Sequence, residues 1–293
     1  MNPLLNKIAL GSAQFGLDYG INNKTGKIPR EDAYKILDSL MENKIEFIDT
    51  AQAYGESENI LGSYIRENNS SFKIISKIQD CAHDKVEILI RKTIERLAVK
   101  NLYGLLLHSF DTYTKNPSTY KKVISAKSDG LIEKAGFSLY YPNQLIKILD
   151  DNIEFDLVQI PYNLFDRRFE KYFHVLKERN VEIHVRSVFL QGLFFMQPGD
   201  LPQNLKEFSD QLLLLKEYSA KLGITIYELA LLFVISNPLI DKSVIGIDNV
   251  YHLEDIIKVL NDNQKLEYVN SQKTFLSKLE IGNETILIPS NWK

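Results

Sequence analysis

The chain has 293 residues and a formal net charge of −3. This balance offers no basic field for phosphate backbones, so we expect no nucleic acid partner. The single cysteine, Cys81, excludes an intramolecular disulfide and a metal cluster built from several cysteines. No apolar run reaches about 18 residues, and the first residues, MNPLLNKIALGSAQ, lack the pattern of a secretory signal. We therefore expect a cytoplasmic protein without a membrane partner.

Short apolar runs alternate along the chain with longer amphipathic segments. Such short and continuous runs are typical of strands that are covered on both faces, as in parallel sheets. They predict strands at residues 7–10, 46–49, 73–76, 103–107, 133–137, 156–160, 181–185 and 242–246.

Helical periodicity fills most of the intervals between these strands. In the first interval, Ala33, Ile36 and Leu40 fall on one face of a helix. A helix-ending glycine, Gly223, stands where a later helix is expected to stop. Helices are predicted at residues 30–44, 57–68, 84–99, 205–223 and 225–238, and others are predicted to begin near residues 141, 167 and 250.

This alternation predicts the fold class. Eight strand–helix units without a linker between them predict an α/β protein, a (β/α)8 TIM barrel that forms a single domain over residues 1–293. A C-terminal helix and tail, at about residues 262–293, are expected near the substrate pocket. The main alternative is a doubly wound open sheet, which carries a G-x-G-x-x-G turn after its first strand. The segment LGSAQFGLDYG does not have that spacing, so the barrel is favoured.

Polar residues stand at the C-terminal ends of three neighbouring strands, where TIM barrels carry their chemistry. Asp49 ends the second strand with Tyr54 on the loop beyond, Lys77 ends the third, and His108 follows the fourth. A cation beside a phenol is expected to lower the pKa of Tyr54 from about 10, which would make it a proton donor near neutral pH. Each residue alone also has a simpler interpretation, as a helix cap, a solvated lysine or a core histidine.

Together these residues resemble a family. The segments FIDTAQAYGESENILG, SK at residues 76–77 and LLLH at residues 105–108 are similar to those of the aldo-keto reductases, and the resemblance extends from LGSAQFG to VIGIDNVYHLED. These barrel enzymes transfer hydride from a nicotinamide cofactor to an aldehyde or ketone. The resemblance implies that Tyr54 is the general acid in reduction, that Lys77 and Asp49 tune its proton affinity, and that His108 positions the carbonyl.

The resemblance also implies that NADPH or NADH binds across the remaining strand ends. The expected cofactor contacts are Gly11, Ser12, Ser138, Gln159, Arg186, Ser187, Leu190, Gly192, Gly246, Asp248, Asn249, His252 and Asp255. Three positions depart from the family: Leu139 stands where an Asn follows Ser138, Arg186 replaces the aromatic residue that stacks on the nicotinamide, and Ile256 stands where the family has Asn. A guanidinium plane can lie over a ring, although two cations repel when the cofactor is oxidised.

The segment after the eighth strand bears on the choice between NADH and NADPH. Reductases of this family that prefer NADPH place Lys or Arg near the 2′-phosphate, whereas VIGIDNVYHLEDI places Asp248 there. Its charge would oppose a phosphate dianion, which tilts the expectation toward NAD or dual use and leaves the preference open. Asp248 and Asn249 have an equal alternative as N-caps of the following helix.

The substrate is expected to be a small carbonyl compound. Phe15 and Tyr19 after the first strand, Tyr113 after the fourth, and Trp292 in the C-terminal tail are expected to wall its pocket. Aromatic walls suit sugars and other polyols as well as hydrophobic carbonyls. The stretch QGLFFM resembles branches of the family found with sugar and cell-surface polysaccharide pathways.

Two other functions stay open at this point. The first is a dinucleotide-binding regulatory subunit that senses redox state, against which the complete set of four catalytic residue types argues. The second is a barrel enzyme with unrelated chemistry, such as an isomerase or a hydrolase. A metal-dependent version lacks support, because the five histidines form no i,i+4 pair and no H-E-x-x-H motif, so no metal is expected.

Overall fold

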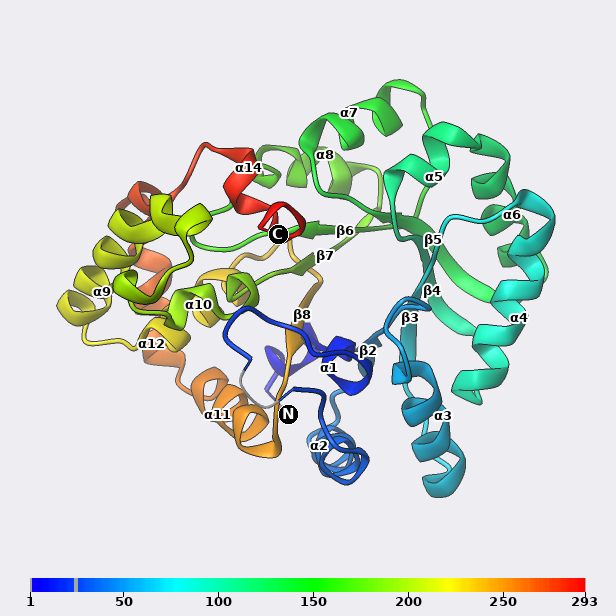
Figure 1. Cartoon of the computed structure of the whole chain (residues 1–293), viewed down its shortest axis with the longest axis horizontal. Coiled ribbons are helices and arrows are strands. Elements are labelled where there is room, and N and C mark those ends of the chain that lie inside the picture. Colours follow the sequence, from blue (N-terminus) through cyan, green and yellow to red (C-terminus); the bar gives the residue numbers. More distant parts are fainter. Residues whose placement is uncertain (1, 24–25, 293) are drawn as a thin grey trace.

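The computed structural model describes residues 2–23 and 26–292. Its eight parallel strands form one closed barrel in the order β1 to β8, with β8 paired to β1 (Figure 1). The strands are β1 (Ile8–Gly11), β2 (Phe47–Asp49), β3 (Lys73–Ile78), β4 (Leu102–Leu107), β5 (Ile132–Ser138), β6 (Leu157–Pro161), β7 (Glu182–Arg186) and β8 (Lys242–Gly246). The predicted (β/α)8 barrel is therefore confirmed.

Helices surround the barrel. The α-helices are α1 (Ala13–Gly16), α2 (Arg30–Glu42), α3 (Ser57–Asn68), α4 (Val86–Leu97), α5 (Phe110–Lys115), α6 (Pro117–Ser128), α7 (Pro142–Asp150), α8 (Phe173–Glu178), α9 (Ser209–Leu222), α10 (Ile226–Ile235), α11 (Val250–Leu260), α12 (Asn263–Ser271), α13 (Lys273–Leu276) and α14 (Glu284–Leu287). Short 3₁₀ segments are η1 (Leu5–Lys7), η2 (His83–Lys85), η3 (Glu170–Tyr172), η4 (Leu190–Phe195), η5 (Pro198–Asp200), η6 (Gln203–Phe208), η7 (Ser277–Leu279) and η8 (Pro289–Asn291).

The interior of the barrel changes from apolar to polar toward the C-terminal ends of the strands. Buried apolar side chains fill its middle; they are Ala9, Phe47, Ile75, Leu106 and Leu157. Side chains two residues apart on a strand lie on the same face. The next residues on the inner face, toward the C-terminal ends of the strands, are therefore Asp49, Lys77 and Gln159. The alternation of the strands thus places three polar groups in one layer above an apolar plug.

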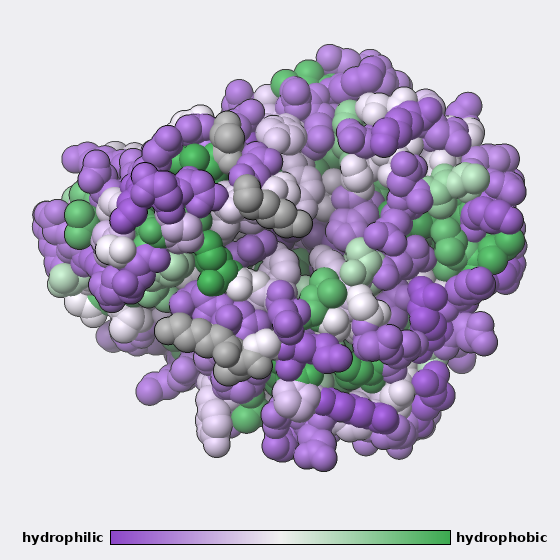
Figure 2. Space-filling view, viewed as in Figure 1, coloured by the Kyte–Doolittle hydropathy of each residue, from purple (hydrophilic) through white to green (hydrophobic). Residues whose placement is uncertain are grey.

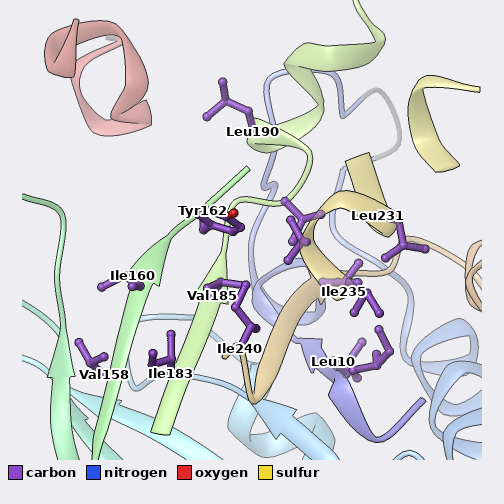
Figure 3. Close-up of a cluster of buried hydrophobic side chains, with 14 of the residues drawn as sticks. Leu10, Val158, Ile160, Tyr162, Ile183, Val185, Leu190, Leu231, Ile235 and Ile240 are labelled. Atoms are coloured by element: carbon purple, nitrogen blue, oxygen red, sulfur yellow. The ribbon is translucent and has the colours of Figure 1, made fainter. Parts of the chain in front are cut away.

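The other face of the strands packs against the helices. Leu10, Val158 and Ile183 point outward from the barrel toward a cluster that includes Leu231 and Ile235 of α10 (Figure 3). Such a double-sided cover explains why the strands read as continuous apolar runs. Burying a side chain of this size contributes about 1.5–3 kcal/mol relative to exposure.

The helix α10 is apolar along its length because it lies in this outer core. A capping box fixes its start: Glu228 N donates to Thr225 Oγ1 at 3.2 Å, and Thr225 N donates to Glu228 Oε2 at 2.9 Å. Within the described residues, no single helix is long and apolar enough to cross a membrane. In the described part of the chain, one pair of helical segments, Gln203–Leu222 and Ile226–Ile235, is long and apolar enough when taken together. This pair is bent by 89°, and its second helix is buried from Leu229 to Ile235.

Two parts of the helical layer differ from the prediction. The interval between β4 and β5 holds α5 and α6, for which the sequence analysis made no prediction. The C-terminal segment holds the short helices α12, α13 and α14. It packs beside the β6 loop, where Ile281 N donates to the carbonyl oxygen of Phe165 at 2.9 Å. The face of the molecule shown in Figure 2 is hollowed near its centre.

Candidate active site

A buried ion pair lies at the C-terminal ends of β2 and β3. The side chain of Lys77 is 1% exposed, and its Nζ donates to Asp49 Oδ1 and, at 3.0 Å, to the carbonyl oxygen of Thr50. Gln159 Nε2 donates to Asp49 Oδ2 at 2.7 Å. Removing two charges from water is costly, and a pair buried so completely at the strand ends of a barrel marks a candidate functional site.

Tyr54 and His108 join this pair. Lys77 Nζ lies 5.2 Å from the centroid of the Tyr54 ring, and the rings of Tyr54 and His108 meet edge to face with their centroids 5.8 Å apart. The four residues come from β2, the loop after it, and the ends of β3 and β4. The structure therefore brings together the acid, phenol, ammonium and imidazole that the sequence placed at neighbouring strand ends.

The loop that carries Tyr54 is held by a close approach of two backbones. A Cβ atom on Gly16 would lie 1.8 Å from the carbonyl oxygen of Tyr54. Gly55 has a positive φ of 51°, and a Cβ there would lie 2.5 Å from the carbonyl oxygen of Gly16. Only glycine tolerates such contacts, so this pair fixes the phenol by seating the β2 loop directly on α1.

The pKa of Tyr54 moves in the opposite direction from the prediction. Burial raises the pKa of Tyr54, the charge of Asp49 raises it further, and Arg186 acts against both. The expected lowering by Lys77 is wrong for the protein alone, because burial of the phenol and the charge of Asp49 are the larger effects. Tyr54 therefore keeps its proton at neutral pH.

His108 is held in its neutral form. Burial, followed by the cations of Lys77 and Arg186, lowers the pKa of His108 to about 3. A neutral imidazole can donate one hydrogen bond without carrying a charge. This agrees with the predicted role for His108 of orienting a carbonyl oxygen.

The pKa of His108 predicts how stability depends on pH. Between pH 6.5 and about 3, the unfolded chain binds a proton at His108 that the folded protein does not. The free energy of unfolding should therefore fall as the pH is lowered through this window, by at most about 1.4 kcal/mol per pH unit for one group. Urea unfolding at pH 7 and pH 5 measures this fall, and the variant His108→Gln should show a smaller one. An equal loss in both proteins would contradict the prediction.

A cavity of about 480 Å³ opens at this end of the barrel. Asp49, Tyr54 and Gln159 lie on its wall, whereas Lys77 and His108 do not. Other wall residues are Tyr19, Gly20 and Asn22 of the β1 loop, Arg186, Ser187, Gln191 and Gly192 at and after the end of β7, and Gly246, Asp248, His252 and Asp255 at and after the end of β8. The cavity thus extends from Asp49 and Tyr54 to the ends of β7 and β8.

Most of the predicted cofactor residues lie on this wall. They are Gly11, Gln159, Arg186, Ser187, Gly192, Gly246, Asp248, His252 and Asp255. Four others do not line it and have different contacts. Ser12 is buried and donates from Oγ to the carbonyl oxygen of Asp49 at 2.9 Å, while Ser138 and Leu190 are buried. Asn249 caps α11 by accepting a hydrogen bond from His252 N at 3.1 Å, as its alternative interpretation expects.

The predicted substrate wall is largely corrected. Tyr19 lines the cavity, but Phe15 is fully buried in the core because its short helix turns it inward. Tyr113 packs edge to face on Phe137, with ring centroids 5.8 Å apart. Trp292 packs on Phe208 and donates from Nε1 to the carbonyl oxygen of Ile286 at 2.7 Å. No described residue after Ile256 is on the cavity wall, so the C-terminal tail does not form it.

Gln14 is a wall residue that the sequence analysis missed. It is 8% exposed, its Nε2 donates to Asp248 Oδ1, and its Oε1 is buried without a hydrogen-bond partner. A buried amide oxygen without a partner is costly, and a ligand in the cavity can satisfy it. The position of Gln14 two residues after the predicted contact Ser12 was the available signal.

Two loops meet across the mouth of the site. Ile21 N of the β1 loop donates to the carbonyl oxygen of Gln191 at 3.1 Å, and Gln191 Nε2 donates to the Tyr19 hydroxyl at 3.0 Å. This contact joins segments about 170 residues apart and was not predicted from the sequence.

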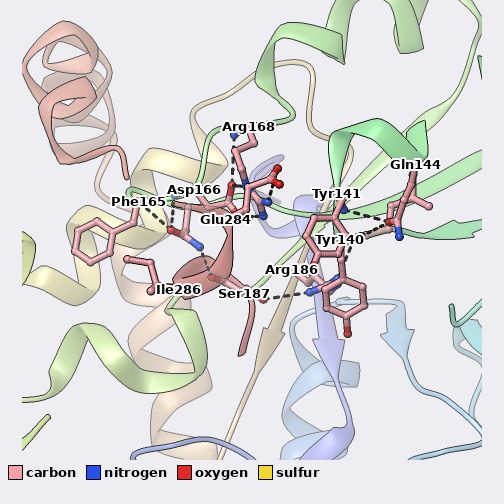
Figure 4. Close-up of polar contacts among 12 residues, drawn as sticks. Tyr140, Tyr141, Gln144, Phe165, Asp166, Arg168, Arg186, Ser187, Glu284 and Ile286 are labelled. Carbon is pink, nitrogen blue, oxygen red and sulfur yellow. Dashed lines mark hydrogen bonds and ion pairs between the residues drawn. The ribbon is translucent and has the colours of Figure 1, made fainter. Parts of the chain in front are cut away.

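The end of β7 is held by the loop after β6 (Figure 4). Asn163 Nδ2 donates to the carbonyl oxygen of Ser187 at 3.0 Å, and Asn163 Oδ1 accepts from the backbone of Phe165 and Asp166. Arg168 closes this group with an ion pair to Asp166 at 2.8 Å. The loop after β7 is thus positioned by a network beneath the cavity.

Arg186 adopts a defined position at this end. Its Nη2 donates to the carbonyl oxygen of Leu139 at 3.0 Å, and its guanidinium carbon lies 4.1 Å from the centroid of the Tyr140 ring (Figure 4). The cation therefore stacks on Tyr140, a partner that was not predicted from the sequence. Among the described residues, no group of three or more His, Cys, Asp or Glu side chains could hold a metal ion.

Comparisons with known proteins agree with this geometry. The model of the Aldo/keto reductase family matches residues 7–272. The chain is 22% identical over 289 residues to the uncharacterized oxidoreductase YqkF of Bacillus subtilis (strain 168), covering 90% of this chain and 94% of that protein. It is 26% identical over 200 residues to the oxidoreductase sirO of Leptosphaeria maculans, covering 64% of this chain and 60% of that protein.

Solved structures share the fold at low identity. The holo form of the aldo-keto reductase AKR11C1 from Bacillus halodurans superposes with a TM-score of 0.74 at 18% identity, covering 98% of this chain and 95% of that one. Its apo form gives a TM-score of 0.68 at 19% identity, with 90% and 91% covered. Since the family match extends over most of the barrel, this chain belongs to the aldo/keto reductase family.

Proposed function

We propose that this oxidoreductase reduces an aldehyde or ketone to an alcohol with NADH or NADPH, and that Tyr54 is the general acid. The observation that carries the proposal is the meeting of Tyr54, the Asp49–Lys77 ion pair and His108 beside one cavity. The fold alone does not require a buried ion pair at this place, because such a pair is costly to bury. Carbonyl reduction, in contrast, requires a proton donor and a charge that stabilises the donor after it loses its proton.

The residues on the cavity wall fit a dinucleotide. Gly246 is exposed at the end of β8, and the absence of a side chain there leaves space for Gln14, since a Cβ would lie 2.7 Å from Gln14 Oε1. Gln159 Nε2 donates a hydrogen bond to Asp49. The amide oxygen of Gln159 can therefore accept a hydrogen bond from the carboxamide of the cofactor. Gln14 Oε1 can accept a ribose hydroxyl. The bound dinucleotide supplies the hydride, and the chain supplies position and electrostatics.

The raised pKa of Tyr54 supports its role as the source of the transferred proton. Burial keeps the phenol protonated at rest, and neutral His108 donates a hydrogen bond that orients the carbonyl. As negative charge develops on the carbonyl oxygen, Tyr54 donates its proton there. The Lys77 cation 5.2 Å from the ring then stabilises the phenolate, which is an effect that grows toward the transition state.

The substrate is a small carbonyl compound, and we include sugars and sugar-derived carbonyls among the candidates. Tyr19 offers an aromatic surface with a hydroxyl, and Asn22 adds an amide on the same wall. A planar ring with adjacent hydrogen-bonding groups is suited to polyols as well as to apolar carbonyls.

Two measurements test the proposed function. Fluorescence titration with NADH and NADPH should show saturable binding, and a panel of aldehydes, ketones and sugars should show oxidation of the cofactor at 340 nm (the absorbance of reduced nicotinamide). Binding without turnover across the whole panel would reject the reductase and favour the redox-sensing subunit. Absence of binding would reject both.

Asp248 is expected to set the preference between the two dinucleotides. Its carboxylate lies on the cavity wall, accepts from Gln14 and lies 3.6 Å from His252 Nδ1. The variant Asp248→Arg should raise the affinity for NADPH relative to NADH by about tenfold, since it replaces repulsion of the 2′-phosphate by attraction. Fluorescence titration measures both affinities, with Asp129→Arg as the control on an exposed helix end. An unchanged ratio would remove Asp248 from cofactor selection.

A further inference from the structure

Arg186 is a cation on the cavity wall without an acidic partner. It lies at the end of β7 and is partly buried, and no carboxylate among the described residues lies within ion-pair distance of its guanidinium. Asp49 lies on the same cavity wall, but its carboxylate is already paired with Lys77. Since a cation that is partly removed from water and unpaired is costly, an anion in the cavity would offset this cost.

The contacts of Arg186 leave donors free for a ligand. Tyr140 covers one face of the guanidinium at 4.1 Å, and Nη2 gives one hydrogen bond to the carbonyl oxygen of Leu139. A second contact, from Nη1 to Ser187 Oγ, is long at 3.5 Å. A guanidinium has five N–H donors, and all of them lie in its plane, so its edge can bind an anion while its faces are stacked.

The cation also acts on the groups that perform the proposed chemistry. Its field opposes the raised pKa of Tyr54 and of Tyr19, and it contributes to the lowered pKa of His108. Arg186 also shares the cavity wall with Tyr54, which is proposed to contact the carbonyl oxygen. The acidic wall residues Asp248 and Asp255 come instead from the segment after β8.

We propose that Arg186 binds a carboxylate or phosphate group of the substrate, so that the preferred substrates are carbonyl compounds that carry an anion. This rests on the proposed function of the same site. An aromatic side chain would stack on Tyr140 without the cost of an unpaired charge, so stacking alone does not account for an arginine here. An anionic substrate also offsets the repulsion between Arg186 and an oxidised nicotinamide.

Paired substrates test the proposal. Succinic semialdehyde and butanal have the same chain length, as do glyceraldehyde 3-phosphate and glyceraldehyde, and each pair differs by an anion. The natural protein should show a kcat/KM at least tenfold higher for an anionic member. Arg186→Met should remove at least tenfold of that advantage beyond any loss that it shares with the neutral members, while Arg186→Lys should recover part of it. The control Arg179→Met removes an exposed cation at the end of α8 and should change nothing.

Binding measurements separate the substrate from the cofactor and from a folding defect. Calorimetric titration with succinate, at an NADH concentration that fluorescence shows to saturate each protein, should give a dissociation constant at least tenfold weaker in Arg186→Met. A weaker NADH affinity with an unchanged ratio of anionic to neutral substrates would assign Arg186 to the cofactor diphosphate and overturn the proposal. If Arg186→Met does not fold, Arg186→Lys must still lower the ratio, because an ammonium cannot bind a carboxylate in bidentate fashion, and an unchanged ratio overturns it.

The two proposals fail in different ways. If no carbonyl of either kind is reduced, the proposed function fails, and the succinate titration still decides whether Arg186 binds an anion. If both neutral and anionic carbonyls are reduced with equal efficiency, the proposed function stands and the inference on Arg186 fails.

Discussion

The variant Tyr54→Phe is expected to lose carbonyl reduction by a factor of roughly a hundred to ten thousand, the usual contribution of a general acid. Phenylalanine keeps the ring and its edge-to-face contact with His108 and removes only the hydroxyl that would carry the proton. The affinity for dinucleotide should persist, because the ring and the cavity wall are retained. Steady-state turnover and fluorescence titration on the same sample measure the two properties.

A matched control for this variant is Tyr19→Phe. Tyr19 also lies on the cavity wall, and burial raises the pKa of its hydroxyl to about 12, but it is not beside Lys77. It should lower turnover by much less than Tyr54→Phe does. Full activity of Tyr54→Phe would refute the assigned mechanism, and an equal loss in both variants would show that the effect is not specific to the proposed acid.

The variant Lys77→Met is expected to lower both stability and turnover. It leaves Asp49, which is 2% exposed, with a buried charge and only the hydrogen bond from Gln159. Breaking one member out of a buried ion pair costs about 3–5 kcal/mol, which urea unfolding would measure as a shift of the midpoint. Turnover should fall at least a hundredfold, because the phenolate of Tyr54 loses the cation beside its ring.

The double variant Lys77→Met with Asp49→Asn separates these two effects. It removes both charges, so much of the lost stability should return while the turnover stays low. Gln159 can still hydrogen-bond to the asparagine in place of Asp49. If the free energy of unfolding of the single variant is within about 1 kcal/mol of that of the natural protein, the ion pair contributes little to stability. Its burial would then have a different origin.

Much of the barrel could be predicted because parallel strands leave a direct trace in the sequence. A strand covered on both faces is apolar over most of its buried length, and each of the eight strands contains a short apolar run. The helices α5 and α6 left a weaker trace. Pro117 interrupts their segment, and polar residues follow it closely, so the segment lacks the wide apolar stripe that marks the other helices.

The residues of the proposed catalytic group were more predictable than the walls of the cavity. Asp49 and Lys77 follow from strand geometry, because each lies two residues beyond a buried apolar side chain on its own strand. The direction of a loop side chain has no such rule. Phe15 and Tyr113 are as aromatic as any pocket residue, but burial in the core is the commoner way to satisfy a large ring, and both are buried there.

The pKa of Tyr54 could not be predicted from neighbours in the sequence. Proximity to Lys77 suggested a lowered pKa, but the larger effects are burial and the charge of Asp49. Both depend on how the loops cover the strand ends, and this is a property of the folded protein alone. For the same reason the stack of Arg186 on Tyr140 became visible only in three dimensions.

The hydrogen bond from Gln159 to Asp49 joins residues 110 positions apart, on strands that lie across the barrel from each other. Neither half of the chain contains both partners together with the sheet that aligns them. We therefore expect that chemical competence is an all-or-none property of the closed barrel. During unfolding in denaturant, activity should disappear together with the global loss of structure, and a fragment that ends before β6 should retain none of it.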